Sequence, residues 1–243
     1  GCETLDSEAL AADLDLPVRQ TAIQAAGGTD EAIEAGTQAA RELIANARSG
    51  RRTETGLDDL TLGIVASDLA ESTVEAATPL VGDLAQSVTD AGGRVVVGGL
   101  EPLVPHAEHA VDIAADDTVV AALRQSLDER ADVVPPTPLR REAADRSLDE
   151  VTGLWADEPI VDVLGYGEAA THERGVALVD AGDQFEEAAT ALVAAGAQVV
   201  VHVTADGIPT GHPVAPVVKV TGDPETALRA AWEEFWTVQL RLL

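Results

Sequence analysis

The chain has 243 residues, of which 46% are hydrophobic, and its 43 acidic and 15 basic residues give a formal net charge of −28. That length and apolar content suffice to bury one large core or two smaller ones, so neither disorder nor a disulfide framework is required. The single cysteine, Cys2, excludes an intrachain disulfide. The charge argues against nucleic acid as a partner, because phosphate binding needs clustered lysine and arginine.

The excess of acidic residues also indicates the salt concentration to which the protein is adapted. Lys219 is the only lysine, and aromatic residues make up 2% of the chain. Crowded surface carboxylates repel one another in dilute buffer, whereas counter-ions screen that repulsion to within about 3 Å at 1 M salt. The composition therefore favours a protein adapted to molar salt, as in haloarchaea, over an ordinary acidic protein. No apolar run is long enough to span a membrane, and we expect a cytoplasmic location.

The N-terminal segment, residues 1–55, is expected to be helical. The run from Thr29 to Arg48 has apolar residues at helical spacing, and Thr29 can serve as its N-cap. Acidic residues follow in the first turn, and Gly50 fits the end of the helix. We expect residues 6–50 of this segment to contribute packing and not chemistry.

Residues 56–243 alternate strand and helix patterns. The predicted strands are Leu62–Ala66, Arg94–Val97, Val176–Val179 and Gln198–Val203, and the predicted helices are Ser72–Ala91 and Glu186–Ala195. This alternation is typical of an α/β fold with a mostly parallel, Rossmann-like sheet and flanking helices. We therefore expect one α/β domain after the helical segment.

This domain reads as two βαβ halves, about 56–132 and 147–243. Both contain the letters EAAT, at Glu75–Thr78 and at Glu187–Thr190, which either an ancient duplication or an alanine-rich composition can explain. The connection Val133–Arg141 is rich in proline and is interpreted as a linker or surface loop.

The C-terminal end concentrates aromatic side chains. Trp232, Phe235 and Trp236 lie near helical spacing and predict a docked C-terminal helix. A subunit interface there, and with it a homo-oligomer, is the alternative.

The ends of the predicted strands indicate where a ligand would bind. Right-handed crossovers place the carboxyl ends of parallel strands on one edge of the sheet, where open α/β sheets bind their ligands. Here those ends are residues 66–68, 98–101, 180–183 and 204–207.

Several segments in one order carry a resemblance. They are PIVDVLGYGE, GVALVDAG, AATALVAAGAQVVVHVTADGIPTG and APVVKVTGD between Pro159 and Asp223, preceded by GCE, LGIVASD, AEH and RSLDEVTG. This pattern resembles the C-terminal region of the altronate and galactarate dehydratases, a family of sugar-acid hydro-lyases with a sulfolactate sulfo-lyase among its relatives. The resemblance implies removal of water from a sugar acid such as altronate or galactarate, with a divalent metal, iron in particular, as Lewis acid.

The resemblance assigns metal ligands to the start of the chain. Gly1-Cys2-Glu3 matches a glycine-cysteine-glutamate motif of the family, which implies that Cys2 and Glu3 lie near the metal. In the family this motif lies inside the polypeptide, after a small N-terminal domain. We therefore expect either a separate small β-rich subunit or an N-terminal domain to complete the enzyme. A frayed terminal residue is the alternative for Cys2.

The resemblance also places substrate-binding and catalytic groups. Ser67 and Asp68 correspond to the end of a Gly-Gly-Ser-Asp motif and Ser72 to its following serine, with Asp68 expected to be catalytic and both serines to bind substrate. The two glycines of that motif are Val65 and Ala66 here, whose Cβ atoms narrow the approach to an anion.

A second matched motif is GYGE. Gly165 and Gly167 are expected to bind substrate and Glu168 to be catalytic, against the alternative of a turn residue beside a helix cap. Gly207 is also expected to bind substrate. His212, in a Gly/Pro-shaped segment, is the third catalytic candidate.

Two charged positions depart from the family. Arg146 stands where the family has a lysine, and arginine keeps the charge without serving as a base near neutral pH. Asp206 replaces an arginine suited to binding a carboxylate. These departures keep a second function open, that of a catalytically degenerate paralogue acting as a binding or structural subunit.

The remaining histidines are weaker candidates. His106 and His109 have a spacing that metal ligands use, although a solvated polar turn explains it better. His202, within VVVHVT, is expected to be a buried core histidine with its hydrogen bonds satisfied.

Overall fold

The structure, a computed structural model, describes residues 9, 12, 27–49, 54–156, 158–205 and 210–222. The chain divides into two units, residues 1–54 and 55–243. The described part of the first unit contains helix α2 (Thr29–Ser49), with Asp30 and Glu31 in its first turn, which confirms the predicted helix. Among the described residues, no helix combines the length and apolar character that crossing a membrane requires.

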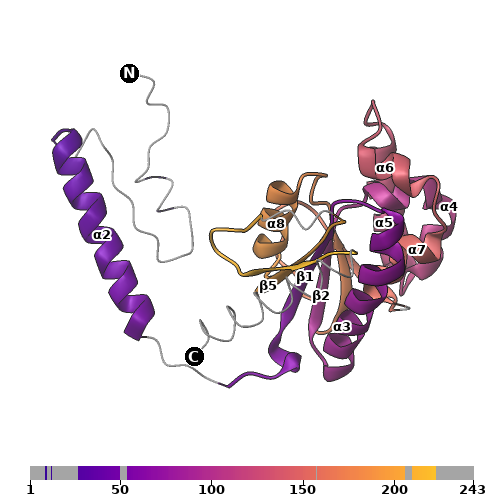
Figure 1. Cartoon of the computed structure of the whole chain (residues 1–243), viewed down its shortest axis with the longest axis horizontal. Helices are drawn as coiled ribbons and strands as arrows, with labels where there is room; N and C mark the ends of the chain where they lie inside the picture. The colour runs from indigo at the N-terminus through magenta and orange to yellow at the C-terminus, as the bar shows by residue number, and fades with distance from the viewer. Residues whose placement is uncertain are drawn as a thin grey trace. The chain divides into compact units, whose positions relative to one another are not determined.

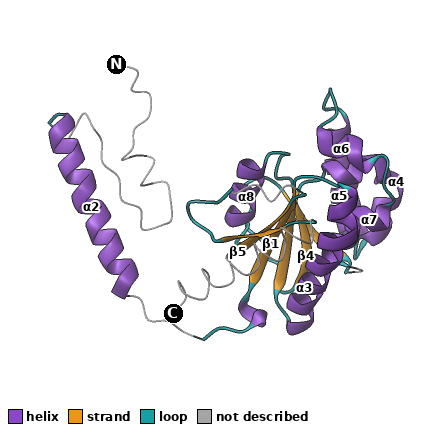
Figure 2. Cartoon of the chain, viewed as in Figure 1, coloured by secondary structure: helices purple, strands orange, loops and turns teal. Residues whose placement is uncertain are grey.

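The second unit is built on a parallel sheet of six strands (Figure 2). Every described neighbour pair in it is parallel, and the strand order is β3-β4-β2-β1-β5-β6. The predicted α/β fold is therefore confirmed. The strands are β1 (Thr61–Ala66), β2 (Arg94–Gly98), β3 (Ile160–Leu164), β4 (Gly175–Val179), β5 (Val199–Val203) and β6 (Val217–Val220).

Helices cover both faces of this sheet (Figure 1). Side chains of α3, α5, α6 and α7 pack into the larger core on one face, and α8 packs into a smaller core on the other. The helices are α3 (Thr78–Ala91), α4 (Ala107–Ala110), α5 (Asp117–Ala131), α6 (Pro138–Ala143), α7 (Leu148–Thr152) and α8 (Phe185–Ala194), and a π-helical turn (Thr73–Ala77) leads into α3.

The central strands show why the sequence forms this sheet. All five residues of β4 are buried, and such continuous β-branched and apolar runs are typical of parallel strands covered on both faces. Along β5 the side chains alternate between the two cores, with Val201 in the larger core and Val200 in the smaller one.

The two predicted halves do not form two separate sheets. β1 and β2, from the first half, lie in the middle of the sheet, while strands of the second half flank them on both sides. The two EAAT segments also differ in place, because one spans the end of the π-helical turn and the first residue of α3, and the other lies within α8 on the opposite face. The halves are therefore interleaved.

The proline-rich connection is not entirely a loop. Pro138 begins helix α6, where a missing N–H costs nothing, and the hydroxyl of Thr137 accepts a hydrogen bond from the Arg140 N–H as N-cap. Leu139 and Arg140 are buried. The interpretation of Val133–Arg141 as a linker or surface loop is thus wrong for its second half. The predicted C-terminal helix after Trp232 lies outside the described residues.

Candidate active site at the carboxyl ends of β1 and β5

The strand order creates a switch point between β1 and β5. The chain leaves β1 through α3 on one face of the sheet and enters β5 from α8 on the other. Connections that diverge to opposite faces leave a crevice at the carboxyl ends of the two strands, and this is where open α/β sheets bind ligands. Ser67 and Asp68 follow β1 there, and Thr204 and Ala205 follow β5.

Asp68 ties the two strand ends together. Its Oδ2 accepts a hydrogen bond of 2.7 Å from the Ala205 N–H, after β5. Its Oδ1 accepts bonds from the Thr73 hydroxyl at 2.6 Å and from the Ala70 N–H at 3.2 Å. Thr73 begins the π-helical turn, an irregularity frequent at functional sites. Asp68 therefore fixes the shape of the crevice.

Ser67 makes a different set of contacts. Its Oγ lies 2.6 Å from His202 Nε2, and His202 Nδ1 lies 3.1 Å from the Thr210 hydroxyl. The His202 ring also stacks on Phe185 of α8, with the ring centroids 4.2 Å apart. The predicted buried and satisfied histidine is therefore confirmed, since the side chain is 2% exposed and both ring nitrogens have partners.

The ionisation of His202 follows from this burial. Desolvation lowers its pKa from 6.5 to about 4; the positive charge of Lys219 acts in the same direction, whereas the carboxylates of Asp68 and Glu186 oppose it. The imidazole is therefore neutral at neutral pH. A neutral ring can accept a hydrogen bond at one nitrogen while the N–H group at its other nitrogen donates one.

A hollow of about 500 Å³ opens beside Asp68, on the face covered by α3 and α6. Arg146 supplies its positive charge and makes an ion pair of 3.3 Å with Glu150. Glu142 accepts a hydrogen bond of 2.8 Å from the Leu69 N–H. The hollow is lined by Asp68, Leu69, Ala70, Glu142, Asp145, Arg146 and Ala205.

A buried ion cluster lies along the same edge of the sheet. Glu101, which follows β2 and is 1% exposed, accepts hydrogen bonds from Arg140 Nε at 2.7 Å and from the Thr137 hydroxyl at 3.1 Å. Arg130 lies 3.7 Å from the other carboxylate oxygen of Glu101 and donates to Asp180, after β4. We call Glu101, Arg130, Arg140 and Asp180 the ion cluster.

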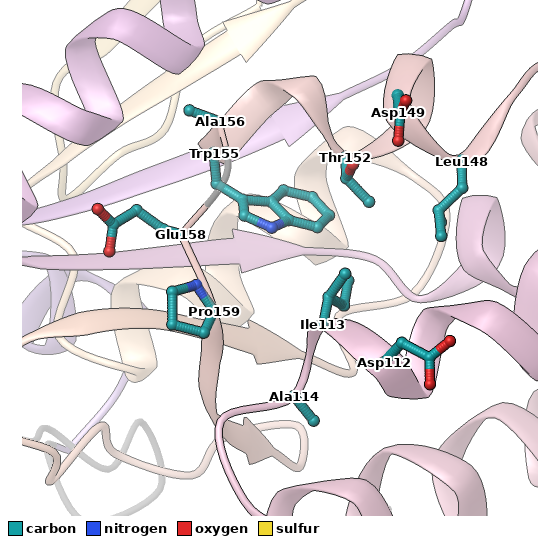
Figure 3. A pocket seen from close by; sticks show the side chains of 10 residues that line it. All are labelled: Asp112, Ile113, Ala114, Leu148, Asp149, Thr152, Trp155, Ala156, Glu158 and Pro159. Carbon is teal, nitrogen blue, oxygen red and sulfur yellow. The ribbon is translucent and has the colours of Figure 1, made fainter.

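A second hollow, of about 260 Å³, lies near the start of β3, at the opposite edge of the sheet. Trp155, Ile113 and Leu148 provide apolar surface (Figure 3). The carboxylates of Asp112 and Glu158 lie on opposite sides of the indole and do not converge on one point. This hollow therefore lacks the converging polar groups of a catalytic site.

The resemblance-derived residues are not gathered at one point. Glu168 is exposed on the turn after β3, and its Oε2 accepts a hydrogen bond of 2.9 Å from the Gly165 N–H. Gly167 lies in the same turn, with a positive φ of 81°. Because β3 is three strands away from β1, this turn lies roughly 14 Å from the switch point at the usual strand spacing.

Ser72 and His212 lie in two further segments, the turn before α3 and the loop before β6. His212 Nδ1 accepts hydrogen bonds of 3.3 Å from the N–H groups of Val214 and Ala215, so the ring shapes its own loop. Its Nε2 lies 3.4 Å from the Thr190 hydroxyl of α8. Ser72 is exposed beside Thr73, where Gly222 approaches it closely enough that a Cβ would lie 2.2 Å from the Ser72 carbonyl carbon.

The expected metal finds no site in the described part of the chain. Its residues contain no group of three or more histidine, cysteine, aspartate or glutamate side chains that could hold an ion. His106 Nε2 bonds instead to the Ala143 carbonyl at 3.0 Å. Cys2, Glu3 and the substrate-binding candidate Gly207 lie outside the described residues. The described residues alone thus do not fit iron.

Three residues of the crevice were not predicted from the sequence. Thr73, Glu142 and Thr210 reach it from a π-helical turn, from α6 and from the loop before β6. A helix pattern predicted the region of Thr73, but only its contact with Asp68 gives the side chain a role. Polar residues just beyond a strand end are the signal that could have indicated Thr210.

Comparisons with known proteins support the family suggested by the motifs. Residues 152–233 match the family model described as D-galactarate/altronate dehydratase, C-terminal. The chain is also 26% identical over 210 residues to an altronate dehydratase of Bacillus subtilis strain 168, covering 81% of this chain and 42% of that protein. It thus spans less than half the length of this curated relative. Residues 152–233 are therefore similar to the C-terminal region of the D-galactarate/altronate dehydratases.

Proposed function

We propose that this chain is the C-terminal portion of a hydro-lyase that dehydrates a sugar acid such as altronate or galactarate. The observation that carries the proposal is the position of Asp68 at the switch point, where it lines the hollow that also holds Arg146. The match to an altronate dehydratase supports the same reaction class.

The hollow offers groups suited to a polyhydroxy acid. Its volume of about 500 Å³ falls within the range of small-molecule sites. The guanidinium of Arg146 can bind the substrate carboxylate, and the carboxylates of Glu142 and Asp145 can accept hydrogen bonds from hydroxyl groups. Because arginine does not release its proton near neutral pH, Arg146 binds charge and another group must accept the substrate proton.

A divalent metal, iron by resemblance, remains part of this proposal. Bound to the substrate, it would stabilise the negative charge that develops when the proton beside the carboxylate is removed. The described residues do not provide its ligands, so these would come from Cys2 and Glu3 or from a small β-rich subunit or N-terminal domain. We therefore expect the complete enzyme to need more than the described residues.

The test is turnover of a panel of aldonates and aldarates in concentrated KCl, with Fe²⁺ and with any small protein encoded beside this chain. The expected product is a 2-keto acid, detected as its semicarbazone. Arg146→Gln should raise KM for the substrate, whereas Arg141→Gln, which removes an exposed arginine of α6 bonded to the Pro136 carbonyl, should not. No turnover and no bound metal in any combination would eliminate the enzyme.

A second candidate is a catalytically degenerate paralogue that serves as a binding or structural subunit. The observation that favours it is that Glu168 and His212 both accept hydrogen bonds from N–H groups of their own loops. Such a subunit would bind the same sugar acids, or a partner protein, without converting them. Calorimetric binding of an aldarate without release of keto acid in the presence of every component would support this candidate.

A further inference from the structure

A chain of hydrogen bonds leads from the surface of the switch point into the protein. Its outer end is Ser67, an exposed residue, and its inner part is His202, which is 2% exposed. The contacts are Ser67 Oγ to His202 Nε2 at 2.6 Å and His202 Nδ1 to Thr210 Oγ1 at 3.1 Å. A ligand in the crevice could therefore touch Ser67 but not the imidazole.

Both ends of the Ser67–His202 contact are held in place. The Ser67 N–H donates to the Val203 carbonyl at 2.9 Å, which continues the pairing of β1 with β5. Within that pairing, Val65 is the register partner of His202. Stacking on Phe185 fixes the plane of the ring. This contact is thus built by rigid elements, as the geometry of a catalytic pair requires.

One of the two neutral tautomers of the ring suits proton transfer from Ser67. A neutral imidazole carries one N–H, and when Nδ1–H donates to Thr210 the lone pair of Nε2 faces the Ser67 hydroxyl. The hydroxyl can then transfer its proton to Nε2. The charged groups around the ring are Lys219, its register partner on β6, Asp68 after β1, and Glu186 of α8.

We propose that Ser67 carries a base-activated hydroxyl at the switch point, with His202 as the buried acceptor of its proton. Ser67 is then the catalytic residue, and His202 is a positioning residue that acts through it. The matched motif accounts for the serine, whereas the proton acceptor comes from the pairing of β1 with β5.

In a dehydration, which rests on the proposed function, the hydroxyl would transfer one proton. Ser67 Oγ takes the proton from the carbon beside the substrate carboxylate while its own proton moves to His202 Nε2. The electrons of the broken C–H bond form the C=C bond of an enol, and the C–O bond at the next carbon breaks. The departing hydroxide receives the proton back through Ser67 and leaves as water.

The test uses the full chain and a fluorophosphonate probe, and needs no substrate. Ser67 Oγ attacks phosphorus, the P–F bond breaks, fluoride leaves, and the serine proton passes to His202. We expect a phosphonylated peptide that contains Ser67. The labelling rate should rise with pH through the range near 4 and stay level above neutral pH, because the base is then fully deprotonated.

Three variants distinguish a Ser67 hydroxyl that is activated by His202 from one that is merely exposed. His202→Gln should slow labelling by about 100-fold and abolish the plateau in the pH profile, and Ser67→Ala should remove the label. Thr210→Val, which removes only the partner of Nδ1, should slow labelling by a smaller factor without unfolding the sheet. Ser87→Ala is the matched control, because Ser87 is an exposed serine bonded to the Asp83 carbonyl on α3.

An unlabelled Ser67 in the native protein would overturn the proposal, as would equal rates in the native protein and a folded His202→Gln variant. If that variant does not fold, an unchanged rate and pH profile in Thr210→Val would overturn it. The labelling test and the dehydration test can give negative results independently of each other. A labelled Ser67 in a protein that turns over no sugar acid would remove the hydro-lyase and leave the activated hydroxyl.

Discussion

Two polar clusters at the same edge of the sheet are built in opposite ways. Around β1 and β5, a neutral chain of hydrogen bonds joins Ser67 to His202, and its outer end is exposed. Around β2 and β4, the ion cluster pairs Glu101 with Arg140, and both side chains are buried. Only the first cluster includes an exposed residue with a reactive hydroxyl group, so only this cluster can act on a ligand.

The energetics of the two clusters also differ. Burying charges is costly unless every charge is paired, so loss of one member of the ion cluster would leave an uncompensated ion in the core. The neutral chain carries no such penalty, but it depends on His202 staying unprotonated. The ion cluster is therefore sensitive to substitution, and the switch point is sensitive to pH.

The largest effect is expected for Arg140→Met. The substitution keeps most of the apolar stem but leaves the carboxylate of Glu101 buried without its donors at 2.7 Å. Losing one partner of a buried ion pair costs about 3–5 kcal/mol of the free energy of unfolding. Denaturant titration in concentrated KCl measures this loss.

Arg141→Met is the control for this change. Arg141 is the exposed neighbour on α6, and its guanidinium bonds only to the Pro136 carbonyl among the contacts of the described residues. Its replacement should cost no more than about 0.5 kcal/mol. Equal stability of the two variants would show that the ion cluster does not hold this edge of the sheet.

The next effect is a loss of stability in acid through His202. The folded pKa of about 4 lies below the ordinary 6.5, so the unfolded chain binds the additional proton between these values. The contribution is therefore complete above about pH 6.5, is lost progressively as the pH falls, and levels off below about pH 4. The loss amounts to at most about 3 kcal/mol.

His202→Gln isolates this contribution. Carboxylates and His172, whose pKa burial also lowers, titrate in the same range, so the informative quantity is the difference between the two proteins. The native protein should lose more stability than His202→Gln between about pH 7 and pH 5. Identical pH dependence in both would mean that the ring is already protonated or solvated in the folded protein.

Local sequence patterns predicted most of the strands and helices around these clusters. The contacts within the clusters depend on pairing between segments that are far apart in the sequence. The valine-rich runs of β1, β2, β4 and β5 and the amphipathic run of α3 are visible in the sequence, because each element has its own periodicity. Edge strand β6 was missed because all four of its residues are only partly buried and Lys219 interrupts the apolar pattern. β3 is similar, with a half-buried centre that includes Asp162.

The candidate site shows the same limit. Ser67 and Asp68 were predicted because they form one motif, but the contact of Ser67 with His202 joins residues 135 positions apart. It depends on β1 lying beside β5 in one register, which neither strand specifies alone. Arg140 was hidden for a related reason, since its proline-rich surroundings are typical of a loop and its partner Glu101 follows a different strand.

The smallest effect tests Asp68 as a connector of β1 and β5. Thr73→Val removes a buried hydroxyl that donates to Asp68 Oδ1 at 2.6 Å, while the Ala205 N–H still binds Oδ2. We expect a loss of about 1–2 kcal/mol, because a hydrogen bond to a charged group disappears without leaving a cavity. Thr89→Val is the matched control, since that hydroxyl only repeats a helix contact with the Gln86 carbonyl. If Thr73→Val proved no more destabilising than the control, Asp68 would be free to exchange partners, and its carboxylate would be available to a ligand.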